Sequence, residues 1–121
     1  FASFKNKKTF FAMTGHIIFN KIDDKNTVTQ SKKIIKLIRN KIGFKDIIIS
    51  DDLSMKSLKG SLKKNTIKTF TAGCNLALHC NGRIKEMEIV GKNSPIINKF
   101  ILKKNITILQ HFKLISSDDR K

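Results

Sequence analysis

Three short apolar segments that alternate with two helix-like segments constrain the fold of this chain more than any other feature. The apolar segments are FFAMTGH (residues 10–16), DIIIS (46–50) and CNLALHCN (74–81), and the segments between them are 31–44 and 61–73. Strands that are joined by helical crossovers pair in parallel, and strands that are apolar throughout are covered on both faces. The alternation therefore predicts an α/β fold with parallel strands and crossover helices.

The first helix-like segment carries a start signal and a stop signal, and the second carries a stop signal. Ser31 stands where a capping side chain begins a helix, and Gly43 stands where a left-handed residue ends one. Gly73 ends the second segment in the same way. Helical spacing predicts one apolar stripe in each segment, formed by Ile34, Ile35, Ile38 and Ile42 in the first and by Leu62, Thr66, Ile67 and Phe70 in the second.

The predicted sheet is too small to stand alone. Three parallel strands leave two open edges and one face with little to cover it. The chain has 121 residues, enough for one ordinary domain, and residues 83–121 are predicted to be mostly helical with a break at GKNSP (91–95). We therefore expect residues 1–121 to form a single partial domain, a portion of a larger α/β barrel or doubly wound sheet.

The composition bounds the possible partners. The net charge of +16 would suit nucleic acid, but the basic residues are spread along the whole chain and all but three are Lys. Arg is the preferred reader of phosphates and bases, and the chain has no Tyr or Trp for stacking, so nucleic acid is not the expected partner. No apolar run approaches the roughly 20 residues of a membrane span, and no membrane association is expected.

The two cysteines indicate a reducing compartment. Cys74 and Cys80 are six positions apart in one predicted strand, which places them about 20 Å apart, far beyond disulfide reach. Free thiols are typical of the cytoplasm, and a cytoplasmic location is expected.

Polar side chains follow each of the three predicted strands. They are Thr14 and His16, then Ser50, Asp51 and Asp52, and finally His79 and Asn81. The carboxyl ends of barrel strands form the active-site face, so these side chains are expected to converge there. A carboxylate at the end of a buried strand loses solvation, which is unfavourable for its charge. Carboxylates in such positions are usually found where an ionised oxygen has a function. Because neighbouring strand residues point to opposite sides, one Asp would enter a site and the other would bond the amides of the following turn.

The segment IGFKDIIISDDLSM (42–55) resembles the seventh-strand segment of the family 3 glycoside hydrolases that act as β-N-acetylhexosaminidases. FAMTGHIIF (11–19) is similar to the end of their sixth strand, and AGCNLALHCN (72–81) is similar to their eighth. The resemblance is strongest over residues 12–82. It implies an incomplete C-terminal portion, about strands six to eight, of a (β/α)8 TIM-type barrel.

The resemblance also implies a mechanism and a substrate. Asp51 would be the nucleophile of a retaining hydrolysis that releases terminal N-acetylglucosamine from peptidoglycan-derived cell-wall saccharides. Asp52 would be the supporting residue, and His16 would line the sugar pocket. No cofactor and no metal ion is expected. A complementary N-terminal half chain is the candidate protein partner.

The general acid/base motif of the family, a KHFPGHG-like loop, has no counterpart in this sequence. Retaining hydrolysis needs that protonation, so the polypeptide alone is expected to be inactive. Two further readings remain. A non-catalytic basic module would bind anionic glycan or RNA with a strong salt dependence. A receiver-like doubly wound domain would use the paired carboxylates to hold Mg²⁺, but the chain has no Gly-rich phosphate loop.

Overall fold

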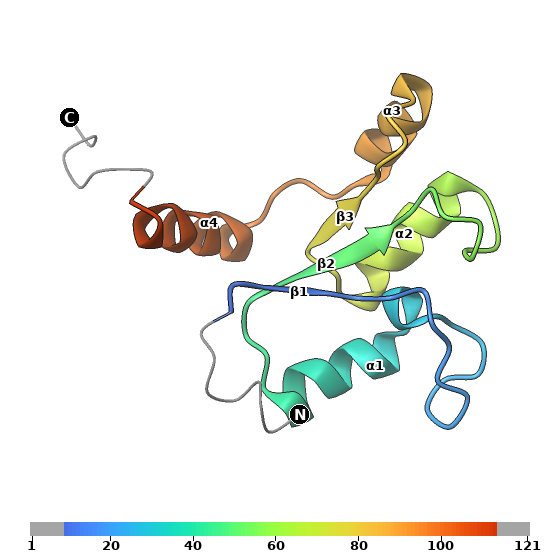
Figure 1. Cartoon of the computed structure of the whole chain (residues 1–121), viewed down its shortest axis with the longest axis horizontal. Coiled ribbons are helices and arrows are strands. Elements are labelled where there is room, and N and C mark those ends of the chain that lie inside the picture. The colour runs from blue at the N-terminus through green and yellow to red at the C-terminus, as the bar shows by residue number, and fades with distance from the viewer. Residues whose placement is uncertain (1–8, 114–121) are drawn as a thin grey trace.

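The computed structural model describes residues 9–113, which form three strands and the helices that connect and follow them (Figure 1). In chain order the elements are β1 (Phe11–Met13), the 3-10 helix η2 (Val28–Gln30), α1 (Lys32–Leu37), the π-helix η3 (Ile38–Ile42), β2 (Ile47–Asp52), α2 (Leu62–Ala72), β3 (Leu76–Leu78), α3 (Ile84–Asn93) and α4 (Lys99–His111).

The three strands form one parallel sheet in the order β1-β2-β3. Phe11 pairs with Ile47 and Met13 with Ile49, and β3 lies on the other side of β2. Each neighbouring pair of strands is connected through a helical segment, as parallel pairing requires. The predicted α/β fold with parallel strands and crossover helices is confirmed at this level.

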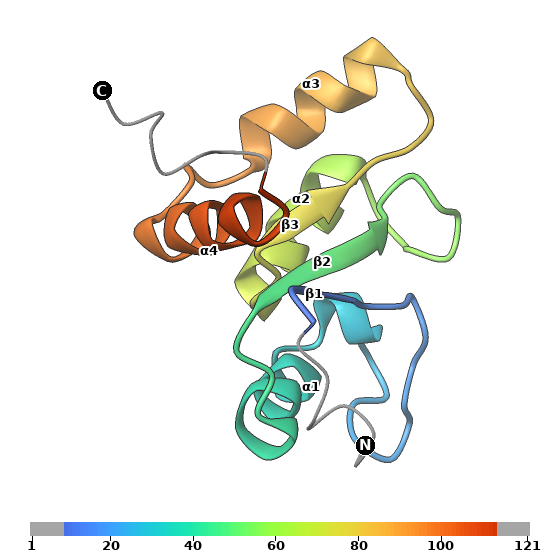
Figure 2. The ribbon, with the colours of Figure 1, turned by 60° about the vertical axis from the view of Figure 1, so that its left-hand side comes forward.

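The core lies between β2 and the two crossover helices. Ile35 of α1, Ile48 of β2, Ala72 of α2 and Cys74 form one buried cluster, so α1 and α2 cover the same face of the sheet (Figure 2). Burial raises the pKa of the Cys74 thiol to about 11. Cys74 is buried and Cys80 is exposed, and both are free thiols.

The helix boundaries follow the signals in the sequence. The Ser31 hydroxyl accepts a hydrogen bond from the Ile34 amide at the start of α1, and the Ser61 hydroxyl caps α2 in the same way. Gly43 and Gly73 both adopt the left-handed conformation at the helix ends, with φ of 77° and 115°. A Cβ at residue 73 would lie 2.9 Å from Ile35 Cγ2, so the close packing of α2 on α1 also requires glycine there.

The buried face of α2 differs from the predicted stripe. Ile67 is 44% exposed, whereas Asn65, Thr66 and Thr69 are buried along with Ala72. Thr66 Oγ1 donates to the Leu62 carbonyl at 2.8 Å, and Asn65 Oδ1 accepts from Gln30 Nε2 at 3.2 Å. These bonds let polar side chains occupy the interface that the apolar pattern assigned to Ile67.

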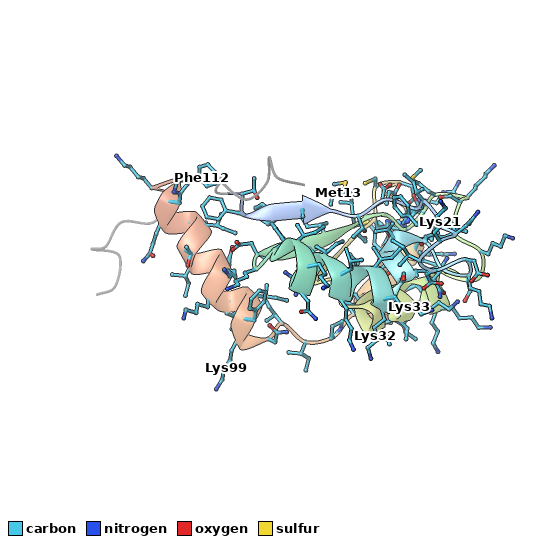
Figure 3. The ribbon with its side chains drawn as sticks, turned by 90° about the horizontal axis from the view of Figure 1, so that it is seen from below. Met13, Lys21, Lys32, Lys33, Lys99 and Phe112 are labelled. Atoms are coloured by element: carbon cyan, nitrogen blue, oxygen red, sulfur yellow. The ribbon has the colours of Figure 1, made fainter. Side chains whose placement is uncertain are left out.

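The other face of the sheet is open at β1. Phe11 and Met13 are 45% and 62% exposed, and Figure 3 shows Met13 on the side of β1 away from the crossover helices. Near the amino ends of the strands, α4 contacts the segments that precede β1 and β2. Lys104 Nζ of α4 lies 2.6 Å from Asp46 Oδ1, and the rings of Phe10 and His111 meet edge to face at 4.8 Å. The carboxyl ends of the strands therefore lie away from α4.

Within residues 9–113, no helix combines the length and the apolar character that crossing a membrane requires. The cytoplasmic location inferred from the cysteines stays a prediction.

Asp23 organises the connection between β1 and α1. Its carboxylate accepts hydrogen bonds from the Ser31 hydroxyl at 2.6 Å and from the amides of Lys25 and Asn26 at 3.2 Å each. The Ser31 hydroxyl bond is the largest cause that lowers the pKa of Asp23 from 3.8 to about 2. The same Ser31 oxygen caps α1, so the charge of Asp23 supports both the loop and the helix start.

Replacing Asp23 by asparagine is expected to destabilise the chain at neutral pH and to remove part of its acid sensitivity. A folded-state pKa of about 2 lies below the ordinary 3.8, so the stabilisation is complete above pH 3.8 and is lost as the pH falls toward 2. Urea midpoints measured across that range should converge for the two proteins at the acid end. Asp24→Asn is the matched control because Asp24 is exposed. A difference that stays constant down to pH 2 would contradict the assignment.

Candidate active site

The carboxyl ends of β1, β2 and β3 lie at one edge of the sheet because the strands are parallel (Figure 1). The structure joins the polar side chains of this edge into two groups. His16 and Asp52 connect the ends of β1 and β2, and the Asp52 carboxylate reaches the Cys80 amide after β3. His79 and Asn81 turn toward Glu86 of α3.

Asp51 is the less engaged of the two adjacent carboxylates. Its Oδ1 accepts a hydrogen bond from the Asp52 amide at 2.9 Å, and the side chain is partly exposed. Within residues 9–113, the Asp51 carboxylate makes no other hydrogen bond. The remaining lone pairs of that carboxylate are therefore available to a ligand.

The following turn and the segment after β3 both donate hydrogen bonds to the Asp52 carboxylate. Its oxygens accept from the Ser54 amide at 2.9 Å, the Ser54 hydroxyl at 2.7 Å and the Cys80 amide at 3.1 Å. Burial by itself raises the pKa of Asp52, but the Ser54 bonds, the Cys80 amide and the His79 charge together bring it below its ordinary value. Asp52 thus acts as an ionised anchor for the turn. The catalytic roles themselves stay predictions.

A register shift accompanies the pair of carboxylates. Ile49 pairs with Leu76 and Asp52 pairs with Leu78, so three steps along β2 match two steps along β3. The Ser50 hydroxyl accepts from the Leu78 amide at 2.9 Å and fills the gap in the ladder. Bulges of this kind redirect side chains next to active sites, and strict alternation therefore does not describe the end of β2.

His16 lies between β1 and β2, with both ring nitrogens engaged inside the protein. Nε2 is 2.9 Å from the Asp52 carbonyl oxygen, and Nδ1 is 3.0 Å from the Thr29 hydroxyl oxygen. Thr29 is fully buried and also lies 2.9 Å from the Thr14 hydroxyl. The structure thus places His16 beside the carboxylate turn, as part of a polar network that includes two buried threonines.

Glu86 is a member of this edge that the sequence did not single out. It accepts from Asn81 Nδ2 at 2.6 Å, contacts His79 Nε2 at 3.1 Å and pairs with Arg83 at 3.2 Å. The Asn81 bond is the largest cause that lowers the pKa of Glu86, followed by the His79 bond. The one available signal was an acidic residue in the first turn of α3, which is common in helices of every function.

The described residues at this edge do not form a metal centre. Within residues 9–113, no three His, Cys, Asp or Glu side chains lie close enough together to hold a metal ion. The chemistry available to the described residues is that of a partly exposed carboxylate with free oxygen lone pairs beside a firmly anchored one.

A family model provides the deciding comparison. The model of the glycosyl hydrolase family 3 N-terminal domain matches residues 2–107. The chain belongs to glycosyl hydrolase family 3. The family membership predicted from the strand-end motifs is therefore confirmed.

Family 3 relatives agree with this result. The beta-hexosaminidase of Methylobacillus flagellatus is 32% identical over 80 residues, which is 64% of this chain and 23% of the relative. That of Nitrosomonas eutropha is 37% identical over 71 residues, 57% of this chain and 20% of the relative. The solved β-N-acetylglucosaminidase of Thermotoga maritima is similar over 89% of this chain and 26% of its own, with a TM-score of 0.63 and 23% identity. This family 3 chain thus spans between a fifth and about a quarter of the length of these three relatives.

Proposed function

We propose that this chain forms the closing part, about strands six to eight, of the (β/α)8 barrel of a family 3 β-N-acetylhexosaminidase. The parallel order β1-β2-β3, with helices on one face, is the arrangement that three successive barrel units would have. The exposed Phe11 and Met13 would face the barrel interior, and the open edges of β1 and β3 would pair with the strands that complete it.

Asp51 is the nucleophile in this proposal. The observation that carries it is the contrast within one motif, because Asp52 is fixed by three donors while Asp51 keeps oxygen lone pairs free at the carboxyl end of the central strand. The Asp51 carboxylate would attack the anomeric carbon of a terminal N-acetylglucosamine unit and expel the leaving oxygen. Water would then hydrolyse the glycosyl-enzyme with net retention of configuration.

The proposed substrates are cell-wall saccharides that contain N-acetylglucosamine, including those derived from peptidoglycan. The proposed partner is a polypeptide that carries the earlier barrel strands and the general acid. Protonation of the leaving oxygen is worth about 10²–10⁴-fold, and the KHFPGHG-like loop that supplies it in the family has no counterpart in this sequence. A complementary half chain, or a preceding segment of a longer protein, would supply both the earlier barrel strands and the general acid.

The test compares the 121-residue polypeptide with a chimaera in which it replaces the segment that it matches in the Methylobacillus flagellatus relative. The polypeptide alone is expected to leave a chromogenic N-acetylglucosaminide intact, and the chimaera is expected to hydrolyse it. Circular dichroism and a cooperative thermal transition establish that the chimaera is folded. A folded chimaera with no activity, or turnover by the polypeptide alone, would overturn the proposal.

A further inference from the structure

His16 is bonded at both ring nitrogens to groups within the protein. A carbonyl oxygen can only accept, so Nε2 carries the proton and donates it to the Asp52 carbonyl over 2.9 Å. Nδ1 lies 3.0 Å from the Thr29 hydroxyl oxygen, so the second ring nitrogen is engaged as well. This arrangement fixes the orientation of the ring.

The Thr29 hydroxyl is itself held in place. It lies 2.9 Å from the Thr14 hydroxyl and 3.2 Å from the Gly15 carbonyl, and Thr29 has no exposed surface. Thr14 also donates to the Ile49 carbonyl at 3.3 Å, one strand away. The ring of His16 is therefore supported by a buried network that connects β1, η2 and β2.

Asp52 connects this network to the neighbouring carboxylate. Its carbonyl accepts from His16, and its amide donates to Asp51 Oδ1 at 2.9 Å. The two bonds involve the backbone carbonyl and the backbone amide of Asp52. The side chain of Asp52 is also held by Ser54 and Cys80. Movement of the Asp52 backbone would therefore change the direction of the Asp51 carboxylate.

We propose that His16 is a positioning residue that aligns the Asp51 carboxylate through Asp52. This inference rests on the proposed function only in giving Asp51 its role as nucleophile. With both nitrogens engaged, the ring offers no free donor or acceptor to a sugar hydroxyl, so the sugar-pocket role expected from the sequence is replaced by an indirect one. Alignment has a large effect on rate, since a misplacement of about 1 Å can cost about 10²-fold.

The first measurement uses the full 121-residue chain and needs no turnover. Nitrogen-15 NMR of the His16 ring is expected to show a proton on Nε2, because the Asp52 carbonyl can only accept. His16→Leu is expected to speed hydrogen exchange of the Asp52 amide roughly tenfold, about the loss of one hydrogen bond, and to leave the Ile35 amide in α1 unchanged. His16→Gln keeps an N–H donor on a side chain of similar reach, so it should restore slow exchange. Unchanged exchange in His16→Leu, or an Nε2 that carries no proton, would overturn the inference.

The second measurement separates positioning from sugar contact in the chimaera. His16→Leu is expected to lower kcat by about 10²-fold while KM stays within about twofold, and His16→Gln is expected to recover most of kcat. A rise in KM at constant kcat would instead assign His16 to the sugar and overturn the inference. If the chimaera is inactive, the proposed function fails while the NMR result still decides whether His16 holds Asp52. Should His16→Leu not fold, the proton on Nε2 of the native ring and the His16→Gln exchange rates decide.

Discussion

Replacing Asp51 by alanine in the chimaera is expected to lower kcat for a dinitrophenyl N-acetylglucosaminide by at least about 10⁴-fold, with azide restoring part of the rate. The substitution removes the carboxylate that forms the covalent bond and leaves a space beside the anomeric carbon. Azide is small enough to enter that space and attack directly. A single displacement inverts the β-linked substrate, so the product is the α-glycosyl azide.

The product decides between a chemical and a structural role of Asp51. A variant that merely disturbed the site would gain nothing from azide. Asp52→Ala is the matched control, because it removes the adjacent carboxylate that anchors Ser54 and Cys80. We expect it to destabilise the turn without azide rescue. If azide instead rescued Asp52→Ala, the two roles would be exchanged, and if Asp51→Ala kept its activity, a substrate-assisted mechanism would apply.

The sequence predicted the parts of the fold that local signals determine. Ser31 caps one helix, Gly43 and Gly73 end helices, and Ile48 lies in the core between two crossover helices. Each of these outcomes depends on a backbone preference or on an uninterrupted apolar run, and both are visible within a few residues. Membership of family 3 followed from longer motifs at the strand ends.

The features that the sequence did not predict depend on contacts between distant segments. The bulge at the end of β2 exists because the Ser50 hydroxyl takes the place of a backbone partner for Leu78. Asn65 is buried on α2 because Gln30 donates to it from another segment, which leaves Ile67 exposed. Apolar periodicity contains no information about such partners.

The same limit applies to the candidate site. The two carboxylates at Asp51 and Asp52 were evident from the end of a buried strand, but their different surroundings were not. The contrast arises from Ser54, which follows in the turn, and from Cys80, which is 28 positions away from Asp52. Glu86 was missed for a similar reason, since it joins the edge only through His79 and Asn81 after β3.

The stability of the sheet that carries Asp51 is expected to depend on Ile48. Its side chain is 1% exposed and lies in contact with residues of both crossover helices. Ile48→Ala removes three buried carbon groups and leaves a cavity that the helices cannot fully close. Substitutions of this type cost about 2–5 kcal/mol, a large fraction of the total stability of a domain of this size.

Urea unfolding followed by circular dichroism tests this expectation through the midpoint and its slope. Ile67→Ala is the matched control, because it makes the same chemical change at a side chain of α2 that is 44% exposed. Alanine also favours a helix more than isoleucine does, so this variant should stay within about 0.5 kcal/mol of the native chain. Equal losses in the two variants would mean that Ile67 is as buried as its apolar stripe predicted. In that case α2 would have to be rotated relative to β2, and the cluster of Ile35, Ile48, Ala72 and Cys74 could not be the core.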